Sequence, residues 1–362
     1  DRESWERGVT LYLPDGKVNL YPTSLSEGAA SLLPDGPRPS ILFSIRVAPD
    51  GKTHLERAER AMIHSRAKLG YATVRDGELP DGFFDLSDRI MTAEKARGAA
   101  RVDPPQQQVV ERSGGTYSLG FRPMSKIEQA NASLSLAANL AIAEALFKAE
   151  TGLFRVMAEP GQRAVSRLRH TAIALGLNWP SQLSLEERER TLNPNDPKDA
   201  AFMLAVRRAG EGARYALYVR GKRPHHAAMA ATYAHGTAPL RRLADRYVTE
   251  AALAVVNRRP VPGWVTTAFS SLAAVMNRAD SRAAQVDAAV IELAESVVLK
   301  DRVGEQLEGR VIDIDERGAR IQLCTEPVLT RIAAQGLTLG QKVKVTLTED
   351  DPARRLSRFA VA

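Results

Sequence analysis

The sequence predicts an α+β domain followed by a small all-β barrel. Two observations lead to this fold class. Over residues 1–302, strand-like and helix-like segments follow one another without regular alternation, which is typical of α+β proteins. From about Val303 to Ala362 the pattern changes to short alternating strands and glycine-marked turns, which indicates a small barrel of the OB type. We therefore expect one domain over residues 1–302 and a second over residues 303–362.

The composition limits the classes of protein and of site. The chain has 362 residues, of which 44% are hydrophobic and 26% charged, as in globular proteins. Its formal charge of +7 is a mild bias toward polyanionic partners such as nucleic acid. Cys324 is the single cysteine, which excludes an intrachain disulfide and a cysteine-based zinc site and favours a reducing, cytoplasmic setting. No apolar run approaches the ~20 residues that span a bilayer, so we expect no membrane segment.

Short strands and turns are predicted at the N-terminal end. Leu11–Leu13 has the character of a strand before a Pro-Asp-Gly turn, and Ile41–Val47 that of a longer strand ending at a second Pro-Asp-Gly turn. The periodicity over residues 52–69 is mixed. This segment could be a strand followed by a helix, and its assignment stays open.

Helices are predicted where apolar residues recur at helical spacing. They span residues 86–101, 125–151, 160–177, 197–210 and 265–300. The second is rich in small apolar residues, ends before Gly152 and is expected to be the buried central helix. Residues 102–108, VDPPQQQ, are expected to form an exposed connection, and residues 213–221 a strand.

The predicted C-terminal barrel has the size of folds that often bind single-stranded nucleic acid. A purely structural barrel is equally compatible with the pattern. Residues 303–362 contain a single aromatic side chain, Phe359, so the usual stacking platforms are nearly absent. If the barrel binds RNA, we expect it to do so mainly through charge.

The stretch YAHGTAPLRRLADRYV, residues 233–248, places two arginines after a turn-like Gly-Thr-Ala-Pro. Because proline is favoured at the first helical position, we expect a helix to begin at Pro239. Arg241 and Arg242 then oppose the helix dipole in the first turn, which is sensible if an anion is bound there. The alternative is an ordinary solvent-exposed helix surface, on which Arg241 pairs with Asp245 at i,i+4 and Arg242 lies in solvent. The spacing alone leaves both open.

Basic and aromatic residues alternate just upstream of this stretch. They are Arg220, Lys222, Arg223, His225, His226 and Tyr233. Such residues can hold phosphates and stack on bases, or form a solvated loop that leads to a core tyrosine. A metal site at His225, His226 and His235 is disfavoured, because they lack a helical i,i+4 pair and a nearby acidic cluster.

Four segments together resemble the catalytic RNB domain of the ribonuclease II and ribonuclease R family. The segments are DRESWERGVTLYLPDGKVNLYPTSLSEGAASLLPDGPRP (1–39), SRAKLGY (65–71), NASLSLAANLAIAEAL (131–146) and HGTAPLRRLADRYV (235–248). Each motif is modest alone, but all four occur in the family's order, and the resemblance covers about residues 1–300. The predicted barrel lies where the family carries an OB-type RNA-binding domain.

The resemblance implies a function and roles for individual residues. Family members are processive 3′-to-5′ exoribonucleases that hydrolyse single-stranded RNA to nucleoside 5′-monophosphates with two divalent ions, Mg²⁺ or Mn²⁺. Tyr12 matches the tyrosine that orients the 3′-terminal nucleotide, and Arg241 the arginine that contacts the scissile phosphate. Asp287 falls near a family glutamate that helps to hold the terminal nucleotide. The implied RNA contacts are His225, Tyr233, Arg220, Lys222 and Arg242.

The chain also departs from the family pattern. The aspartates that bind the metals in the family lie upstream of the tyrosine, and Asp1 is too late to be one of them. We expect these ligands upstream of Asp1, in an N-terminal part that the sequence lacks, and no metal ligand within this chain. A catalytically inactive RNB-like protein that holds RNA 3′ ends, or a structural protein with a basic surface, remains an alternative. We expect a cytoplasmic monomer.

Smaller departures occur within the motifs. Ala238 replaces the signature serine, Leu243 the following tyrosine, Ser133 an acidic residue of the central helix, and Ala30 a cysteine. These changes indicate a divergent branch of the family. None of them removes Arg241.

Overall fold

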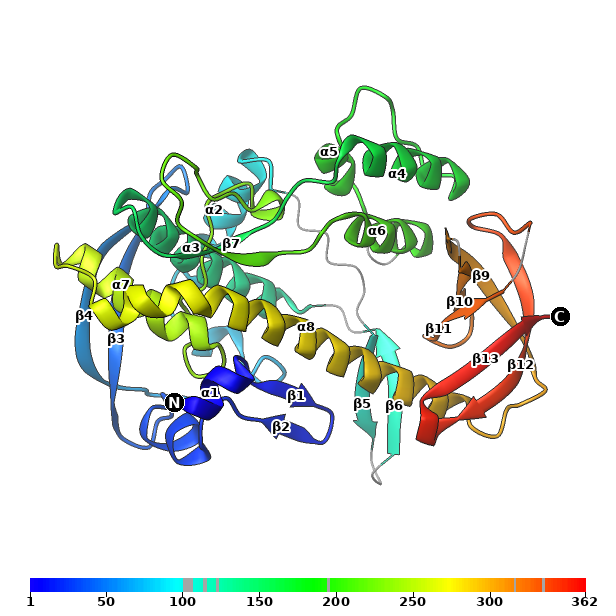
Figure 1. Cartoon of the computed structure of the whole chain (residues 1–362), viewed down its shortest axis with the longest axis horizontal. Coiled ribbons are helices and arrows are strands. Elements are labelled where there is room, and N and C mark those ends of the chain that lie inside the picture. Colours follow the sequence, from blue (N-terminus) through cyan, green and yellow to red (C-terminus); the bar gives the residue numbers. More distant parts are fainter. Residues whose placement is uncertain (100–106, 113–115, 122–123, 194–195, 316, 334–335) are drawn as a thin grey trace.

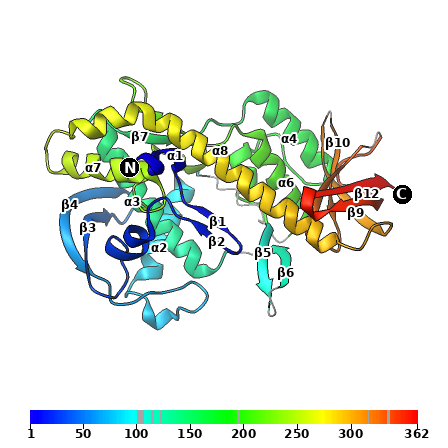
Figure 2. The same ribbon diagram turned by 60° about the horizontal axis from the view of Figure 1, so that its bottom comes forward.

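One long helix connects the two parts of the molecule. The computed structural model describes residues 1–99, 107–112, 116–121, 124–193, 196–315, 317–333 and 336–362. Helix α8 (Gly263–Leu299) starts in the larger part, next to α7 (Leu243–Val256), and ends at the C-terminal barrel, as Figures 1 and 2 show. The chain therefore has the predicted order of an α+β part followed by a small β part.

The larger part contains antiparallel strand pairs and helices. The pairs in the described residues are β1 (Leu11–Leu13) with β2 (Gly16–Val18), β3 (Pro37–Val47) with β4 (Thr53–His64), β5 (Gln107–Arg112) with β6 (Thr116–Phe121), and β7 (Leu153–Val156) with β8 (Arg214–Leu217). The other α-helices in the described part of the chain are α1 (Arg2–Arg7), α2 (Phe83–Ala96), α3 (Lys126–Lys148), α4 (Gln162–Ala174), α5 (Leu185–Glu189) and α6 (Pro197–Ala209).

Helix α3 is the central helix that the sequence predicts. It starts with a capping box, in which the Glu128 amide donates to the Ser125 hydroxyl at 3.2 Å and the Ser125 amide donates to the Glu128 carboxylate at 2.8 Å. Ile142, Ala143 and Leu146 are fully buried in the main core, together with side chains of β7, α7 and α8. The helix is long and apolar enough to span a membrane by composition, but 56% of that window is buried inside the protein.

The C-terminal part is a curled five-stranded sheet of order β11-β10-β9-β12-β13. Its strands are β9 (Gln306–Asp315), β10 (Gly318–Leu323), β11 (Leu329–Ile332), β12 (Lys342–Asp351) and β13 (Leu356–Val361). The edge strands β11 and β13 contact each other, which gives the nearly closed barrel that the sequence predicts. Alternate residues point inward, so Val311, Ile321 and Val345 form a core of their own with Leu299 of α8.

The barrel also packs against the helices of the larger part. Ile312 of β9 lies in an apolar cluster with Phe202 and Val206 of α6. Beside this cluster, the Arg208 guanidinium forms an ion pair with the Asp313 carboxylate at 2.8 Å. The end of α8 and the face of α6 therefore both hold the barrel in place.

Most predicted elements agree with the structure within a few residues. The open segment 52–69 is mainly strand β4, whose partner β3 contains the predicted strand Ile41–Val47. The predicted helix 86–101 begins earlier, at Phe83, and α2 ends at Ala96. Of the predicted connection 102–108, residues 102–106 lie outside the described residues, and residues 107 and 108 belong to β5.

Gly8 determines how closely α1 approaches α8. It ends α1 with φ of 72°, and a Cβ atom added there would lie 2.5 Å from the Cβ atom of Ala279 on α8. We expect Gly8→Ala to lower the free energy of unfolding by about 1–3 kcal/mol, because the left-handed backbone and the contact are both strained. Urea denaturation measures this change.

Gly16→Ala is the matched control for Gly8→Ala. No atom lies within 4 Å of a Cβ atom added at Gly16, at the start of β2. We expect this variant to unfold within about 0.5 kcal/mol of the wild type. Equal stability of the two variants would contradict the packing described for Gly8.

Candidate nucleic-acid site around Arg241

The segment that carries the two arginines is a turn. Helix α7 begins at Leu243, and Arg242 is extended with φ of −134° and ψ of 120°. The Thr10 amide donates to the Arg241 carbonyl at 3.0 Å, and the Leu243 amide donates to the Gly8 carbonyl at 2.9 Å. The predicted helix start at Pro239 is therefore wrong, because residues 239–241 form a turn and backbone pairing with residues 8–10 keeps Arg242 extended.

Asp245 holds the turn from inside. Its side chain is 0% exposed, and one carboxylate oxygen accepts a hydrogen bond from the Ala238 amide at 2.8 Å. The Arg242 guanidinium donates two further hydrogen bonds to the same carboxylate, at 2.9 Å and 2.7 Å. Of the two alternatives that the spacing left open, the Arg241–Asp245 pair is wrong: because α7 starts later than predicted, the carboxylate faces Arg242 instead. Arg242 is only 15% exposed, so its surroundings favour a structural role over RNA contact.

Arg241 is left free at the surface. Its backbone is fixed by hydrogen bonds to Ala238 and Thr10, while its side chain is exposed. Among the described residues no carboxylate forms an ion pair with it. Tyr12, which is 57% exposed, follows Thr10 by two residues on β1. The structure thus brings Tyr12 and Arg241 onto neighbouring segments and leaves both side chains accessible.

Packed rings lie beneath the turn. The Tyr215 hydroxyl and His235 Nδ1 are 3.0 Å apart, and Tyr233 contacts the rings of both His235 and His226. Burial lowers the pKa of His235 well below its usual value, and the charge of Arg242 lowers it further. Burial also lowers the pKa of His226, to about 4. Both histidines are therefore neutral near pH 7, which limits the positive charge beside the arginines.

Three polar residues that were not identified from the sequence contact these rings or the segment around them. Arg155 stacks on the ring of Tyr215 and forms an ion pair with Asp280 of α8 at 2.6 Å. Asn139 of α3 accepts a hydrogen bond from the Gly236 amide at 2.9 Å and donates to the Tyr233 hydroxyl at 3.3 Å. An asparagine within the apolar run of residues 136–143 was the available signal for Asn139.

The remaining predicted RNA contacts fall into two groups. Arg220, Lys222 and His225 are exposed in the segment after β8. Tyr233 is buried against Leu136 and Leu140 of α3, as a core tyrosine would be. RNA contact by any of these side chains stays a prediction.

Asp287 lies on the exposed side of α8. Partial burial raises the pKa of its carboxyl group. Within the described part of the chain, no hydrogen bond or ion pair joins Asp287 to Arg241 or Tyr12, so its role also stays a prediction.

The described residues do not fit a divalent metal ion. They contain no group of three or more histidine, cysteine, aspartate or glutamate side chains close enough to hold one. The acids nearest the turn are already engaged, because Asp245 binds Arg242 and Asp280 binds Arg155. The exposed Arg241 and Tyr12 can therefore hold a phosphate and a nucleotide, but they offer no donor set for a cation.

Comparison with known families decides the relationship. The family model for the RNB domain matches residues 1–257. The chain belongs to the RNB family. A second model, the RNase II-type exonuclease C-terminal S1 domain, matches residues 305–362, which form the barrel.

Curated relatives of this RNB chain include several ribonucleases. It is 23% identical to Ribonuclease R of Vibrio parahaemolyticus over 89% of its own length and 42% of that protein. It is 24% identical to the exosome complex exonuclease RRP44 homolog A of Arabidopsis thaliana over 88% of its length and 36% of that protein. The RNB chain thus spans less than half of the length of these relatives.

Solved structures confirm the fold. The structure of Mycoplasma genitalium RNase R in complex with ribose methylated single-stranded RNA matches 100% of this chain and 64% of that chain, with a TM-score of 0.87 at 17% identity. Yeast Ssd1, described as a pseudonuclease, matches 99% of this chain and 46% of that chain with a TM-score of 0.69 at 16% identity. Because the RNB fold occurs in both, it does not by itself establish cleavage.

We expect Asp245→Asn to destabilise the protein by about 3 kcal/mol, since it leaves the buried Arg242 without its counter-charge. The decrease in the midpoint of urea unfolding measures this effect. Glu3→Gln is the control, because it removes an exposed carboxylate that pairs with Arg7 at 2.9 Å. A comparable loss in both variants would rule out a special role for the buried pair.

The lowered pKa of His226 predicts a pH dependence. In the unfolded chain the His226 imidazole binds a proton near its usual pKa of 6.5, whereas in the folded chain its pKa is about 4. Stability is therefore fully present above about pH 6.5 and is lost as the pH falls toward 4. We expect His226→Gln to reduce the slope of unfolding free energy against pH in this interval. His170→Gln, at an exposed position of α4, should leave the slope unchanged.

Proposed function

We propose that this chain is the RNA-holding part of a processive 3′-to-5′ exoribonuclease that degrades single-stranded RNA to nucleoside 5′-monophosphates. Membership of the RNB family supports the reaction class. The observation that carries the proposal is the exposed guanidinium of Arg241, on a turn that Asp245 and Arg242 hold from inside. In this proposal the scissile phosphate lies against Arg241 and the 3′-terminal nucleotide against Tyr12.

The fixed turn suits Arg241 for stabilising a transition state. Negative charge develops on the phosphate oxygens during hydrolysis, and a positioned guanidinium donates charge-assisted hydrogen bonds to them. Since the backbone on both sides of Arg241 is already hydrogen-bonded, little backbone order is lost when the phosphate binds. Tyr12 lies on a short hairpin and supplies a ring for the terminal nucleotide.

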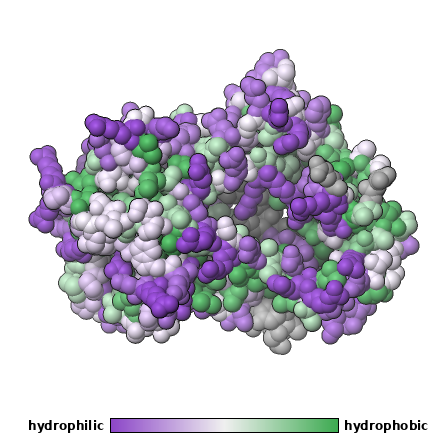
Figure 3. Space-filling view, in the orientation of Figure 1, coloured by the Kyte–Doolittle hydropathy of each residue, from purple (hydrophilic) through white to green (hydrophobic). Residues whose placement is uncertain are grey.

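The rest of the proposal concerns the longer RNA strand. Arg220, Lys222 and His225 are exposed and are assigned to the RNA backbone, and Asp287 to the terminal nucleotide. Hydrophilic side chains also surround a hollow in the middle of the face shown in Figure 3, between the larger part and the barrel. We assign residues 303–362 to charge-based RNA binding. We also propose a cytoplasmic monomer, with Mg²⁺ or Mn²⁺ bound by residues outside this chain.

An RNA-binding protein without nuclease activity is the second candidate. One observation favours it: the chain resembles the pseudonuclease Ssd1 in fold. Such a protein would hold RNA 3′ ends at Arg241 and Tyr12 without cutting them.

Replacement of Arg241 separates the two candidates. In the protein encoded by the complete gene, we expect Arg241→Ala to slow mononucleotide release from a 5′-labelled oligoribonucleotide by about 10³-fold, as for other charge-stabilising donors. Affinity for the same RNA should fall only a few-fold, because one phosphate contact among many is lost. Gel analysis of the products with Mg²⁺ or Mn²⁺ measures the rate, and fluorescence anisotropy the affinity.

Arg163→Ala is the control, since Arg163 is exposed on α4, outside this site. It should leave the rate within about two-fold of the wild type. RNA that binds normally but stays intact in the wild type would favour the second candidate. Equal losses of rate and affinity in Arg241→Ala would contradict the transition-state role.

A further inference from the structure

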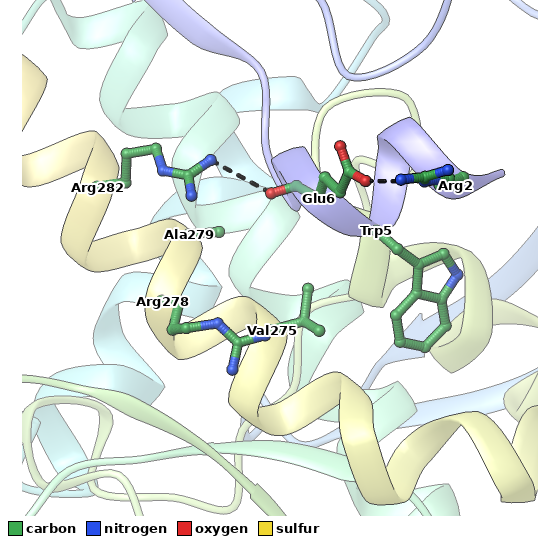
Figure 4. A pocket seen from close by; sticks show the side chains of 7 residues that line it. All are labelled: Arg2, Trp5, Glu6, Val275, Arg278, Ala279 and Arg282. Atoms are coloured by element: carbon green, nitrogen blue, oxygen red, sulfur yellow. Dashed lines mark hydrogen bonds and ion pairs between the residues drawn. The ribbon is translucent and has the colours of Figure 1, made fainter.

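The geometry points to a second nucleotide-binding site, in a hollow between α1 and α8. We propose that this hollow receives one nucleotide unit of an RNA strand, with a phosphate on Arg278 and Arg282 and a base against Trp5. The inference rests on the proposed RNA-binding function and extends it to a surface that contains neither Arg241 nor Tyr12. Figure 4 shows the residues that line the hollow.

The hollow has the size of a small-ligand site. Its volume is about 570 Å³, which lies within the range of pockets that hold small molecules. A second hollow of about 370 Å³ shares Arg278 and Arg282 with it and adds Asn277, Ser281 and Gln285. Together they form a groove along one face of α8, because residues 278, 281, 282 and 285 recur at helical spacing.

The charge of the groove is positive, and the described residues leave its two arginines on α8 without an acidic partner. Arg278 has no ion pair or side-chain hydrogen bond within the described part of the chain. Among the described residues, Arg282 donates only to the Glu6 carbonyl, at 3.3 Å. Two described acids near these arginines already have partners: the Glu6 carboxylate, which lines the hollow, pairs with Arg2 of the same lining at 3.1 Å, and the Asp280 carboxylate pairs with Arg155 at 2.6 Å. Two guanidinium groups are thus available for an anion.

The spacing of these two arginines suits a phosphodiester chain. Residues four apart on a helix are separated by about 6 Å along its axis, so Arg278 and Arg282 can contact one phosphate together or two successive phosphates. Guanidinium groups bind phosphate through paired hydrogen bonds. Ser281 and Gln285 on the same face add neutral donors for phosphate or sugar oxygens.

Trp5 supplies an aromatic wall whose orientation is fixed. Its indole nitrogen donates to the Tyr247 hydroxyl at 3.1 Å, and its ring packs edge-on against Tyr247 with centroids 5.6 Å apart. Gly8 holds α1 close to Ala279, which also lines the hollow. A fixed aromatic face beside free cations is the combination that binds single-stranded nucleic acid without base specificity. This combination favours RNA over a simple inorganic anion.

The test measures RNA binding by the whole 362-residue chain. A fluorescein-labelled oligouridylate is titrated, and anisotropy gives the dissociation constant at several salt concentrations. We expect the double variant Arg278→Gln, Arg282→Gln to bind about tenfold more weakly, and the slope of log affinity against log salt to decrease by about 1.4, the value for two phosphates of single-stranded RNA.

The matched control is Arg163→Gln with Arg167→Gln on α4. These arginines are also exposed and four residues apart, so the control removes the same charge at the same spacing. The control should leave affinity within about two-fold of the wild type. Equal weakening by both double variants would show a general charge effect and overturn the site.

Trp5 is tested with two ligands, because its replacement could also disturb packing on Tyr247. Trp5→Leu should weaken binding of the oligouridylate about tenfold, the effect of one lost stacking contact. Binding of an abasic oligonucleotide of the same length should not change. Equal weakening with both ligands would indicate a structural role and overturn the stacking assignment.

A free nucleotide is distinguished by competition. If millimolar uridine monophosphate abolishes the difference between the wild type and the Arg278, Arg282 variant, the hollow is a mononucleotide site and the RNA-strand proposal is wrong. The outcome is separable from that of the proposed function. If Arg241→Ala lacks its effect on cleavage while the groove variants weaken RNA binding, only the active-site assignment fails; the reverse result removes only the groove.

Discussion

The buried carboxylate of Asp245 organises the surface on which the proposed site depends. It accepts hydrogen bonds from the Ala238 amide and from Arg242, so one turn of backbone is fixed between them. A buried charge of this kind is tolerated only when it is paired and hydrogen-bonded. The pairing consumes Arg242 and leaves its neighbour Arg241 exposed. Two adjacent arginines therefore lie in different surroundings: Arg242 is largely buried, and Arg241 is accessible to a ligand.

Much of the fold could be predicted because it depends on local patterns. The helical spacing of small apolar residues located α3, and the change to alternating strands after Val303 located the barrel. The assignment of 52–69 is open in the sequence because β4 pairs, among the described strands, only with β3, and Ala58 is the only one of its residues that is buried. Local periodicity is weak where a strand lacks a continuous buried face.

The site was less predictable because it depends on contacts between distant residues. Pro239 favours a helix start, but pairing of residues 241–243 with residues 8–10 keeps Arg242 extended and delays the helix until Leu243. Asp245 therefore meets Arg242 and not Arg241. Tyr233 stands in the sequence among basic residues, as a tyrosine that stacks on a base would, yet its side chain is buried against α3. The prominence of Arg241 could be inferred from the order of the family motifs. That none of the described carboxylates forms an ion pair with Arg241 could be seen only in the structure.

Helix α8 has a consequence for the whole molecule. It contains 37 residues, so it is about 55 Å long, and its first half lies in the main core while its end enters the barrel core. A continuous helix transmits rotation as well as distance, since each residue turns it by about 100°. Insertion of a single residue near its middle would rotate the barrel about the helix axis. The contacts of β9 with α6, such as Ile312 with Phe202, would then be lost. A change in the length of α8 therefore keeps the barrel on the same side of the helix only when it adds or removes close to a whole number of helical turns.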